Sequence, residues 1–201
     1  MTTDIQTSRE IRLEIVRKYA AVLRSCRNLI TREDTRLIRS AFDITLENEQ
    51  LPSGIDTGEL LRILDITLIL TREIGLGRTS IICALIHKPV EKGHLTLPEM
   101  QERFGAKVWQ IVKGLLDISR IYATQRIVDS DNFRKLLLGF AQDIRVQLIF
   151  LAEKLYALRQ ADALPEPEQK QLAQETDYIY IPFAHRLGLY NIKSEMEDRS
   201  L

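Results

Sequence analysis

The sequence has little of what several classes of protein require. Its 201 residues include 2 cysteines, 6 prolines and 9 glycines, and 28 basic residues balance 28 acidic ones. The separated cysteines, Cys26 and Cys83, exclude a disulfide framework and a CxxC metal site, so we expect buried free thiols. A net charge of zero gives no general electrostatic reason to expect DNA or an anionic membrane as a partner.

Signals for export and membrane insertion are also missing. The N-terminal segment MTTDIQTSRE contains no apolar stretch of the signal-peptide type. The most apolar run, residues 60–70, is interrupted by Arg62 and Asp65, which excludes a membrane-spanning helix there. We therefore expect a cytoplasmic protein that does not span a membrane.

Helical periodicity dominates what is present. Apolar residues recur at helical spacing throughout, and no run of five or six residues has the strict alternation of a half-buried strand. The predicted fold class is all-α, a compact bundle of many helices. Residues 1–50 are expected to form an N-terminal helical hairpin that belongs to the same domain as residues 51–201. Further helices are predicted at residues 57–70, 79–87, 106–121 and 143–159, from Ser130 or Asp131, and from residue 168 onwards.

Capping and helix-breaking residues predict where these helices begin and end. Pro89 predicts that the short helix before it ends near His87, because the residue before a proline avoids the α region. Pro182 predicts a kink and Gly188 a stop in the last helix. The predicted N-terminal caps are Thr31 with Asp34, Thr57, and Thr96 with Glu99.

The most informative local pattern is an apolar helix that ends near His87, followed by Glu91 and by a distant, buried-looking helix that bears three charged residues. His87 and Glu91 form the first part, and Asp143, Arg145 and Glu153 lie on the second. Glu153 has apolar neighbours, where an unpaired carboxylate is costly, so it needs a partner. A lone histidine in such a place is more often structural than a ligand, because metal sites need several converging ligands.

Several blocks of sequence resemble the hydrolase domain of the RelA/SpoT alarmone synthetase/hydrolases. The string ETDYIYIPFAHRLGLYNIKSEMED, residues 175–198, resembles the HRLG signature that closes that domain. DNFRKLLLGFAQDIRVQLIFLAEKLYALR, residues 131–159, is similar to the family's block with Asp-Ile-Arg-Val and Leu-Ala-Asp-Arg. CALIHKPVEKG and FGAKVWQIVKGLLDIS match two earlier family segments. The blocks occur in the family's order, and the resemblance covers about residues 57–201.

The resemblance implies an HD-domain-like bundle and the chemistry of a metal-dependent phosphohydrolase. In that family, two separated histidines, an aspartate beside the second histidine and a distal aspartate bind a divalent metal, usually manganese. A nearby Glu-Asp pair handles the water that attacks the 3′-pyrophosphate of ppGpp. Imidazole and carboxylate ligands suit such a dication, which polarises both phosphate and water.

Carried over residue by residue, the first part of this site is altered. The first family histidine falls at about Arg62, within one or two residues. The second is kept as His87, but Lys88 replaces its aspartate neighbour, and an ammonium group repels a dication. Of the Glu-Asp pair, Glu91 remains and the aspartate becomes Lys92.

The second part of the site is altered less. The distal metal ligand aligns with Glu153, whose carboxylate lies one methylene further from the backbone, and a nearby family asparagine becomes Ala157. Asp143, Arg145 and Arg159, in the same block, are candidate nucleotide-binding residues.

Too few ligands remain for a stable metal site. The resemblance therefore predicts a regulatory pseudo-hydrolase domain without a cofactor; if any metal binds, His87 and Glu153 would hold it. Basic side chains at the altered positions either neutralise Glu91 or Glu153 in place of the metal or extend into solvent. Two alternatives stay open: an active, Mn²⁺-dependent (p)ppGpp 3′-pyrophosphohydrolase, and a metal-free sensor of guanine nucleotides.

The resemblance also implies partners. In the family, the HRLG segment is followed by a synthetase domain that transfers pyrophosphate from ATP to GTP or GDP. We therefore expect a fragment of a GTP pyrophosphokinase, whose partners are the C-terminal synthetase domain of the same chain and a guanine nucleotide such as ppGpp or GTP. A ribosome would be contacted only through regions outside this sequence.

Overall fold

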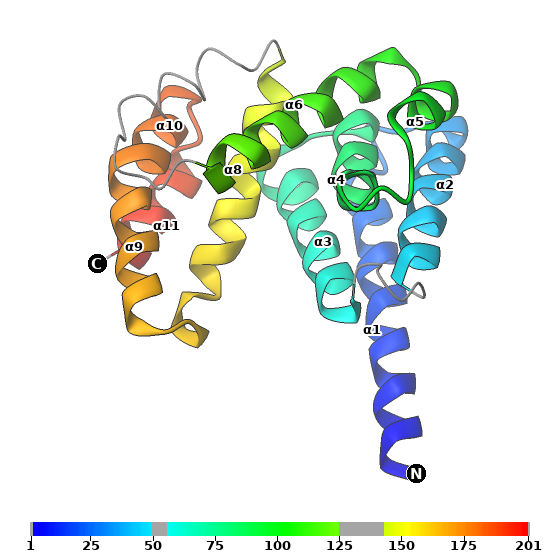
Figure 1. Ribbon diagram of the computed structural model, residues 1–201, viewed down its shortest axis with the longest axis horizontal. Helices are drawn as coiled ribbons and strands as arrows, with labels where there is room; N and C mark the ends of the chain where they lie inside the picture. Colours follow the sequence, from blue (N-terminus) through cyan, green and yellow to red (C-terminus); the bar gives the residue numbers. More distant parts are fainter. Residues whose placement is uncertain (1, 50–55, 125–142, 201) are drawn as a thin grey trace. The chain divides into compact units, whose positions relative to one another are not determined.

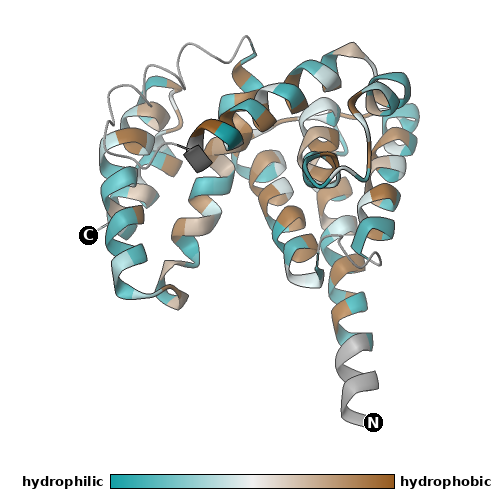
Figure 2. Cartoon of the chain, in the orientation of Figure 1, coloured by the Kyte–Doolittle hydropathy of each residue, from teal (hydrophilic) through white to brown (hydrophobic). Residues whose placement is uncertain are grey.

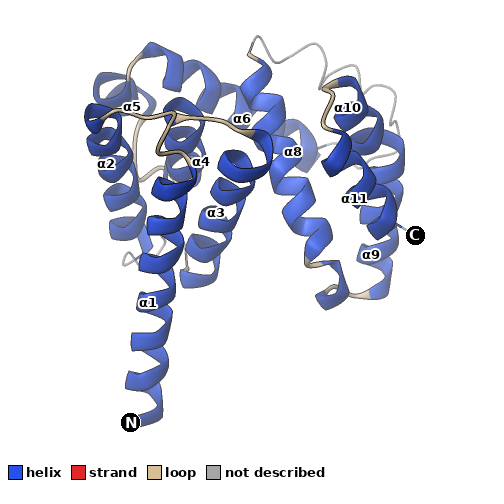
Figure 3. Ribbon diagram, turned by 180° about the vertical axis from the view of Figure 1, so that it is seen from behind, coloured by secondary structure: helices blue, strands red, loops and turns tan. Residues whose placement is uncertain are grey.

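The computed structural model describes the backbone of residues 2–49, 56–124 and 143–200, and the side chains of residues 9–49, 56–121 and 143–200. Within these ranges every regular element is a helix, which confirms the predicted all-α class (Figures 1 and 3). The chain divides into two compact units, residues 1–112 and 113–201. Their relative placement is not determined, so each unit is described by itself.

The described residues of unit 1 form five helices and the beginning of a sixth. They are α1 (Thr2–Ser25), α2 (Arg32–Glu49), α3 (Thr57–Ile69) with a π-helical turn η1 (Leu70–Ile74), α4 (Arg78–Glu91), α5 (Leu97–Phe104) and the start of α6 (Ala106–Thr124). Helix α1 packs against α3, and α2 packs against α4.

The predicted caps of unit 1 are confirmed at two of three helix starts. Thr31 and Asp34 cap each other reciprocally, with backbone-to-side-chain distances of 2.8 and 3.1 Å. Thr96 and Glu99 form a complete capping box. The third prediction is wrong: α3 is capped by Asp56, whose Oδ1 accepts a hydrogen bond of 2.7 Å from the Glu59 N–H. A carboxylate one residue before the helix replaces the Thr57 hydroxyl as the cap acceptor.

Helix α4 is the core helix of unit 1. Every residue from 80 to 87 is buried, and α2 and α3 both contact this helix. Figure 2 shows hydrophobic residues on α3 and α4. A continuous apolar run of this length is typical of a helix that is enclosed on several sides.

Helix α4 does not end near His87, as Pro89 predicted, but continues to Glu91 with the proline inside its last turn. A proline has no N–H to donate to the carbonyl four residues earlier, which is that of Leu85. The Thr45 hydroxyl, from α2, lies 2.9 Å from Leu85 O and supplies a donor. This hydroxyl also lies 2.8 Å from Ala41 O, so its single proton is shared. A tertiary contact thus compensates for the proline and keeps His87 and Glu91 on one helix.

Replacing Thr45 with valine is expected to lower the free energy of unfolding by about 1–2 kcal/mol, because Leu85 O would be buried without this donor. In a Pro89→Ala background the cost should be smaller, since alanine restores an N–H donor. Urea denaturation of the natural chain, Thr45→Val, Pro89→Ala and the double variant measures the cost of Thr45→Val in each background. Thr67→Val is a matched control, because the Thr67 hydroxyl is also buried but bonds only within its own helix. Equal costs in both backgrounds would contradict this account.

Unit 2 contains the rest of α6 and a group of helices around α8. These are α8 (Ile144–Arg159), a 3₁₀ turn η2 (Ala161–Ala163), α9 (Glu166–Glu175), a π-helical turn η3 (Thr176–Tyr180), α10 (Ile181–Arg186) and α11 (Tyr190–Ser200). Helix α11 packs against α8 and α9. The helix start predicted at Ser130 or Asp131 lies outside the described residues.

The predicted last helix is interrupted by a π-helical turn. It begins at Glu166, two residues earlier than predicted, and its α-helical geometry gives way to the π-helical turn η3 before Pro182. Pro182 lies in the first turn of α10, where its missing N–H costs little. Gly188 has a φ of 72° and ends α10, which confirms the predicted stop.

Candidate functional site

His87 is held at the end of the core helix of unit 1. Its side chain is buried, and Nδ1 lies 3.0 Å from Ala84 O. A carbonyl only accepts hydrogen bonds, so Nδ1 carries the proton in the neutral ring and the lone pair is on Nε2. This tautomer is the one that a histidine ligand uses when Nε2 faces a metal.

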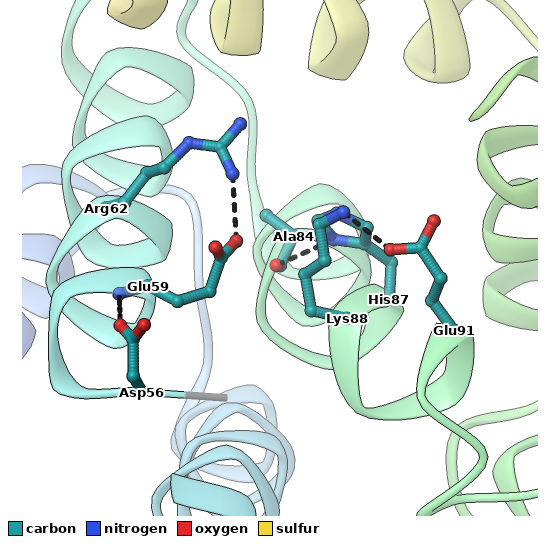
Figure 4. A network of polar contacts seen from close by, with 7 residues as sticks. All are labelled: Asp56, Glu59, Arg62, Ala84, His87, Lys88 and Glu91. Atoms are coloured by element: carbon teal, nitrogen blue, oxygen red, sulfur yellow. Dashed lines mark hydrogen bonds and ion pairs between the residues drawn. The ribbon is translucent and has the colours of Figure 1, made fainter. Parts of the chain in front are cut away.

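Lys88 and Glu91 form an ion pair one helical turn apart. Lys88 Nζ lies 2.5 Å from Glu91 Oε2, and 22% and 35% of the two side chains are exposed (Figure 4). This is one of the pairings that the replacement of a metal by basic side chains predicted. Because both groups are partly in water, the pair itself adds little stability, about 0.2–1 kcal/mol. The exposed Lys92 follows directly as the C-cap residue of α4.

Arg62 lies on α3 and is also paired locally. Its Nη1 lies 2.8 Å from Glu59 Oε1, and the backbone N–H of Glu59 is in turn bound by Asp56 (Figure 4). Sequence reasoning had not considered Glu59. The spacing of Glu59 and Arg62, three residues apart on a predicted helix, is the signal from which this pair could have been predicted.

The groups in this part of unit 1 do not fit a dication. One imidazole, that of His87, stands next to an ammonium group, and the Glu91 carboxylate is engaged by that ammonium. A dication needs several anionic or neutral donors around it and is repelled by a neighbouring cation. Within the part of the chain that the structure describes, no group of three or more His, Cys, Asp or Glu side chains is arranged to hold a metal.

Asp143 and Arg145 organise the beginning of α8 in unit 2. Asp143 is buried, and its Oδ1 accepts from the Arg145 N–H at 3.0 Å as the N-terminal cap. The Arg145 guanidinium closes back on the same carboxylate with two bonds of 2.9 and 2.7 Å. Both candidate nucleotide contacts thus have a local structural role, and nucleotide binding by them stays a prediction.

Arg159 joins the end of α8 to α11. Its guanidinium donates to both carboxylate oxygens of Glu195, at 2.7 and 2.6 Å, and Arg199 Nε lies 2.8 Å from the same carboxylate. These bonds, chiefly those of Arg159, lower the pKa of Glu195 below its usual value. The pair therefore stabilises the fold above the ordinary glutamate pKa, and this contribution is lost as the pH falls through the lowered value.

Glu153 and Ala157 lie one turn apart on α8 and are both half-buried. The apolar neighbours of Glu153 predicted that its carboxylate has a partner, and Glu153 does take part in an interaction. The structure thus places the candidate residues in two groups. Those of unit 1 are Arg62, His87, Lys88, Glu91 and Lys92, and those of unit 2 are Asp143, Arg145, Glu153, Ala157 and Arg159.

Comparison with known proteins identifies the family. Residues 47–190 match the model of the HD domain family. The chain is 39% identical over 145 residues to a guanosine-3′,5′-bis(diphosphate) 3′-pyrophosphohydrolase from Aquifex aeolicus, which covers 71% of this chain and 20% of that protein. It is 34% identical over 127 residues to the bifunctional (p)ppGpp synthase/hydrolase SpoT of Escherichia coli. This match covers 63% of this chain and 18% of SpoT. The chain is an HD domain of the RelA/SpoT family.

The match extends to a relative named for the opposite reaction. The HD domain is 39% identical over 132 residues to a GTP pyrophosphokinase from Myxococcus xanthus, covering 64% of this chain and 17% of that protein. The chain spans about a fifth of the length of the curated relatives it matches. Among its described helices, none combines the length and apolarity needed to cross a membrane.

Proposed function

We propose that this HD domain is a catalytically silent, regulatory part of a (p)ppGpp-metabolising RelA/SpoT protein. The observation that carries the proposal is the ion pair of Lys88 with Glu91, 2.5 Å apart. At the position of Lys88, the family has a metal-binding aspartate next to the histidine that this chain keeps as His87. The Lys88 ammonium also engages Glu91, the carboxylate that remains of the family's Glu-Asp pair.

The charges support this proposal. Loss of a dication from a carboxylate-rich site leaves negative charges that repel one another, and a built-in cation removes this repulsion. Lys88 neutralises Glu91, and Arg62 neutralises Glu59, so these two carboxylates are balanced by the chain itself. A domain of this kind keeps the fold of the hydrolase without the electrophile that the hydrolysis requires.

The second candidate function is an active (p)ppGpp 3′-pyrophosphohydrolase. The names of the relatives from Aquifex aeolicus and Escherichia coli favour it. In this case, hydrolysis would use Mn²⁺ together with His87, Glu91 and Glu153, and the metal would supply Lewis-acid activation of phosphate and water. Lys88 would then have to release Glu91.

A release assay distinguishes the two functions. We expect the protein with Mn²⁺ to release no pyrophosphate from ppGpp above the background of buffer, while the Aquifex aeolicus relative serves as the positive control. Turnover by the natural chain that is abolished both by EDTA and by His87→Ala would overturn the proposal and establish the hydrolase. Calorimetry with ppGpp in EDTA tests the third possibility, a metal-free nucleotide sensor in which lysines bind the phosphates as point charges.

The proposal includes the context in which such a domain acts. We place it in a longer, cytoplasmic GTP pyrophosphokinase, where a C-terminal synthetase domain makes (p)ppGpp and the HD domain controls it through contacts within the chain. The Myxococcus xanthus relative, named for that activity, supports this context. Synthesis by the full-length protein that is unchanged when residues 1–201 are removed would contradict the regulatory role.

A further inference from the structure

A hollow of about 340 Å³ lies at the turn between α1 and α2, and none of the candidate site residues lines it. Three arginines line it: Arg24, Arg27 and Arg32. Leu23 and Ile30 contribute apolar surface, two threonines complete the lining, and no acidic residue takes part. The volume lies in the range of pockets that hold small molecules.

The three arginines are not used by the fold. Among the side chains of residues 9–49, 56–121 and 143–200, none forms an ion pair with any of them, and each is exposed. Other arginines of this protein do have carboxylate partners, among them Arg62, Arg78, Arg145 and Arg159. Three like charges around one hollow repel each other, which costs stability unless an anion is bound.

Two acidic residues, Glu33 and Asp34, lie in the first turn of α2, but neither lines the hollow, and Asp34 is committed elsewhere. Asp34 binds the Thr31 N–H and pairs with Arg78 at 2.7 Å. These bonds, first of all the one from Thr31, lower the pKa of Asp34. The carboxylate is therefore ionised and fully engaged at neutral pH, and it does not cancel the charge of the hollow.

The backbone that carries the arginines is anchored on both sides of the turn. The Ser25 hydroxyl lies 2.6 Å from Thr71 Oγ1, which ties the end of α1 to η1, and Cys26 is fully buried. The Leu29 N–H donates to Cys26 O at 2.8 Å within the turn. A site with fixed backbone positions loses less entropy on binding than a mobile loop does.

We propose that this arginine hollow binds a small ligand that carries two adjacent phosphate groups. A guanidinium presents a planar set of donors that matches phosphate oxygens, and three of them supply enough donors for a diphosphate. Leu23 and Ile30 provide surface for an apolar part of the ligand, such as the face of a base. The site is separate from His87 and does not depend on the function proposed for that residue.

Calorimetry with inorganic pyrophosphate and with ADP, in EDTA and low salt, tests this site. We expect both probes to bind, ADP more tightly if the apolar surface contributes. Arg24→Ala and Arg32→Ala should each weaken binding by about tenfold, since each removes charge-assisted hydrogen bonds. The triple Ala variant at Arg24, Arg27 and Arg32 should abolish it. Arg12→Ala is the matched control, because this exposed arginine lies about 18 Å from Arg24 along the same helix.

Several results would overturn the site. One is that the natural chain binds neither pyrophosphate nor ADP. A second is that Arg12→Ala weakens binding as much as the other arginine variants do. A third is that Lys88→Ala weakens binding and the arginine variants do not, which would place the ligand at α4. Tighter binding of a hexaglutamate peptide than of pyrophosphate would reject the phosphate ligand in favour of an acidic protein segment. The substituted arginines are exposed and form no ion pair with another described side chain, so thermal melting should confirm that the arginine variants fold.

Discussion

A variant with Arg62→His, Lys88→Asp, Lys92→Asp and Glu153→Asp is expected to bind Mn²⁺ at least about a hundredfold more tightly than the natural chain does. Two of these changes remove an ammonium and add a carboxylate, and a third supplies the second imidazole. The fourth restores the shorter carboxylate of the family. Every change converts a cation or a misplaced donor into a ligand that a dication accepts.

Isothermal titration with Mn²⁺ measures this gain, and a three-substitution variant that keeps Lys88 is its control. With Lys88 in place, the ammonium next to His87 should prevent the gain, because it repels the metal and engages Glu91. If the complete variant folds but binds no Mn²⁺, the correspondence of these four positions with the metal site of the family loses its main support.

Leu85→Ala is expected to lower the free energy of unfolding by about 3 kcal/mol. Leu85 is fully buried on α4, the core helix of unit 1. The substitution removes apolar contacts and leaves a cavity that close-packed neighbours fill only in part. Because His87 is two residues away on the same helix, the ring should also lose its fixed position.

Urea denaturation measures this loss, and Leu13→Ala provides the comparison. Leu13 lies on α1 with 47% of its surface exposed, so its truncation should cost less than about 0.5 kcal/mol. A cost below about 1 kcal/mol for Leu85→Ala would show that the interior of unit 1 is not packed as described.

The sequence by itself determined the fold class and many helix boundaries. Helical spacing of apolar residues is a local property, so it predicted the all-α class without knowledge of the packing. The Thr31–Asp34 and Thr96–Glu99 caps and the stop at Gly188 were predictable for the same reason, since each depends on residues within one turn. The division into residues 1–50 and 51–201 stays a prediction.

The sequence identified which residues belong to the candidate site, but it did not predict which of their side chains contact one another. Family resemblance nominated Lys88 and Glu91 and left open whether the lysine pairs or extends into solvent. The ion pair decided this question, because it depends on the rotamers that two long side chains adopt at the end of α4. The roles of the site residues in binding stay predictions.

Only the tertiary structure decided what happens at Pro89 and at the turn between α1 and α2. The proline predicted a helix end, yet the Thr45 hydroxyl, distant in sequence, supplies a donor to Leu85 O and lets α4 continue. The arginine hollow likewise depends on where two helices meet and on the engagement of Asp34 by Arg78. Propensity acts over a few residues, whereas hydrogen bonds and charges between helices depend on which segments the fold brings together.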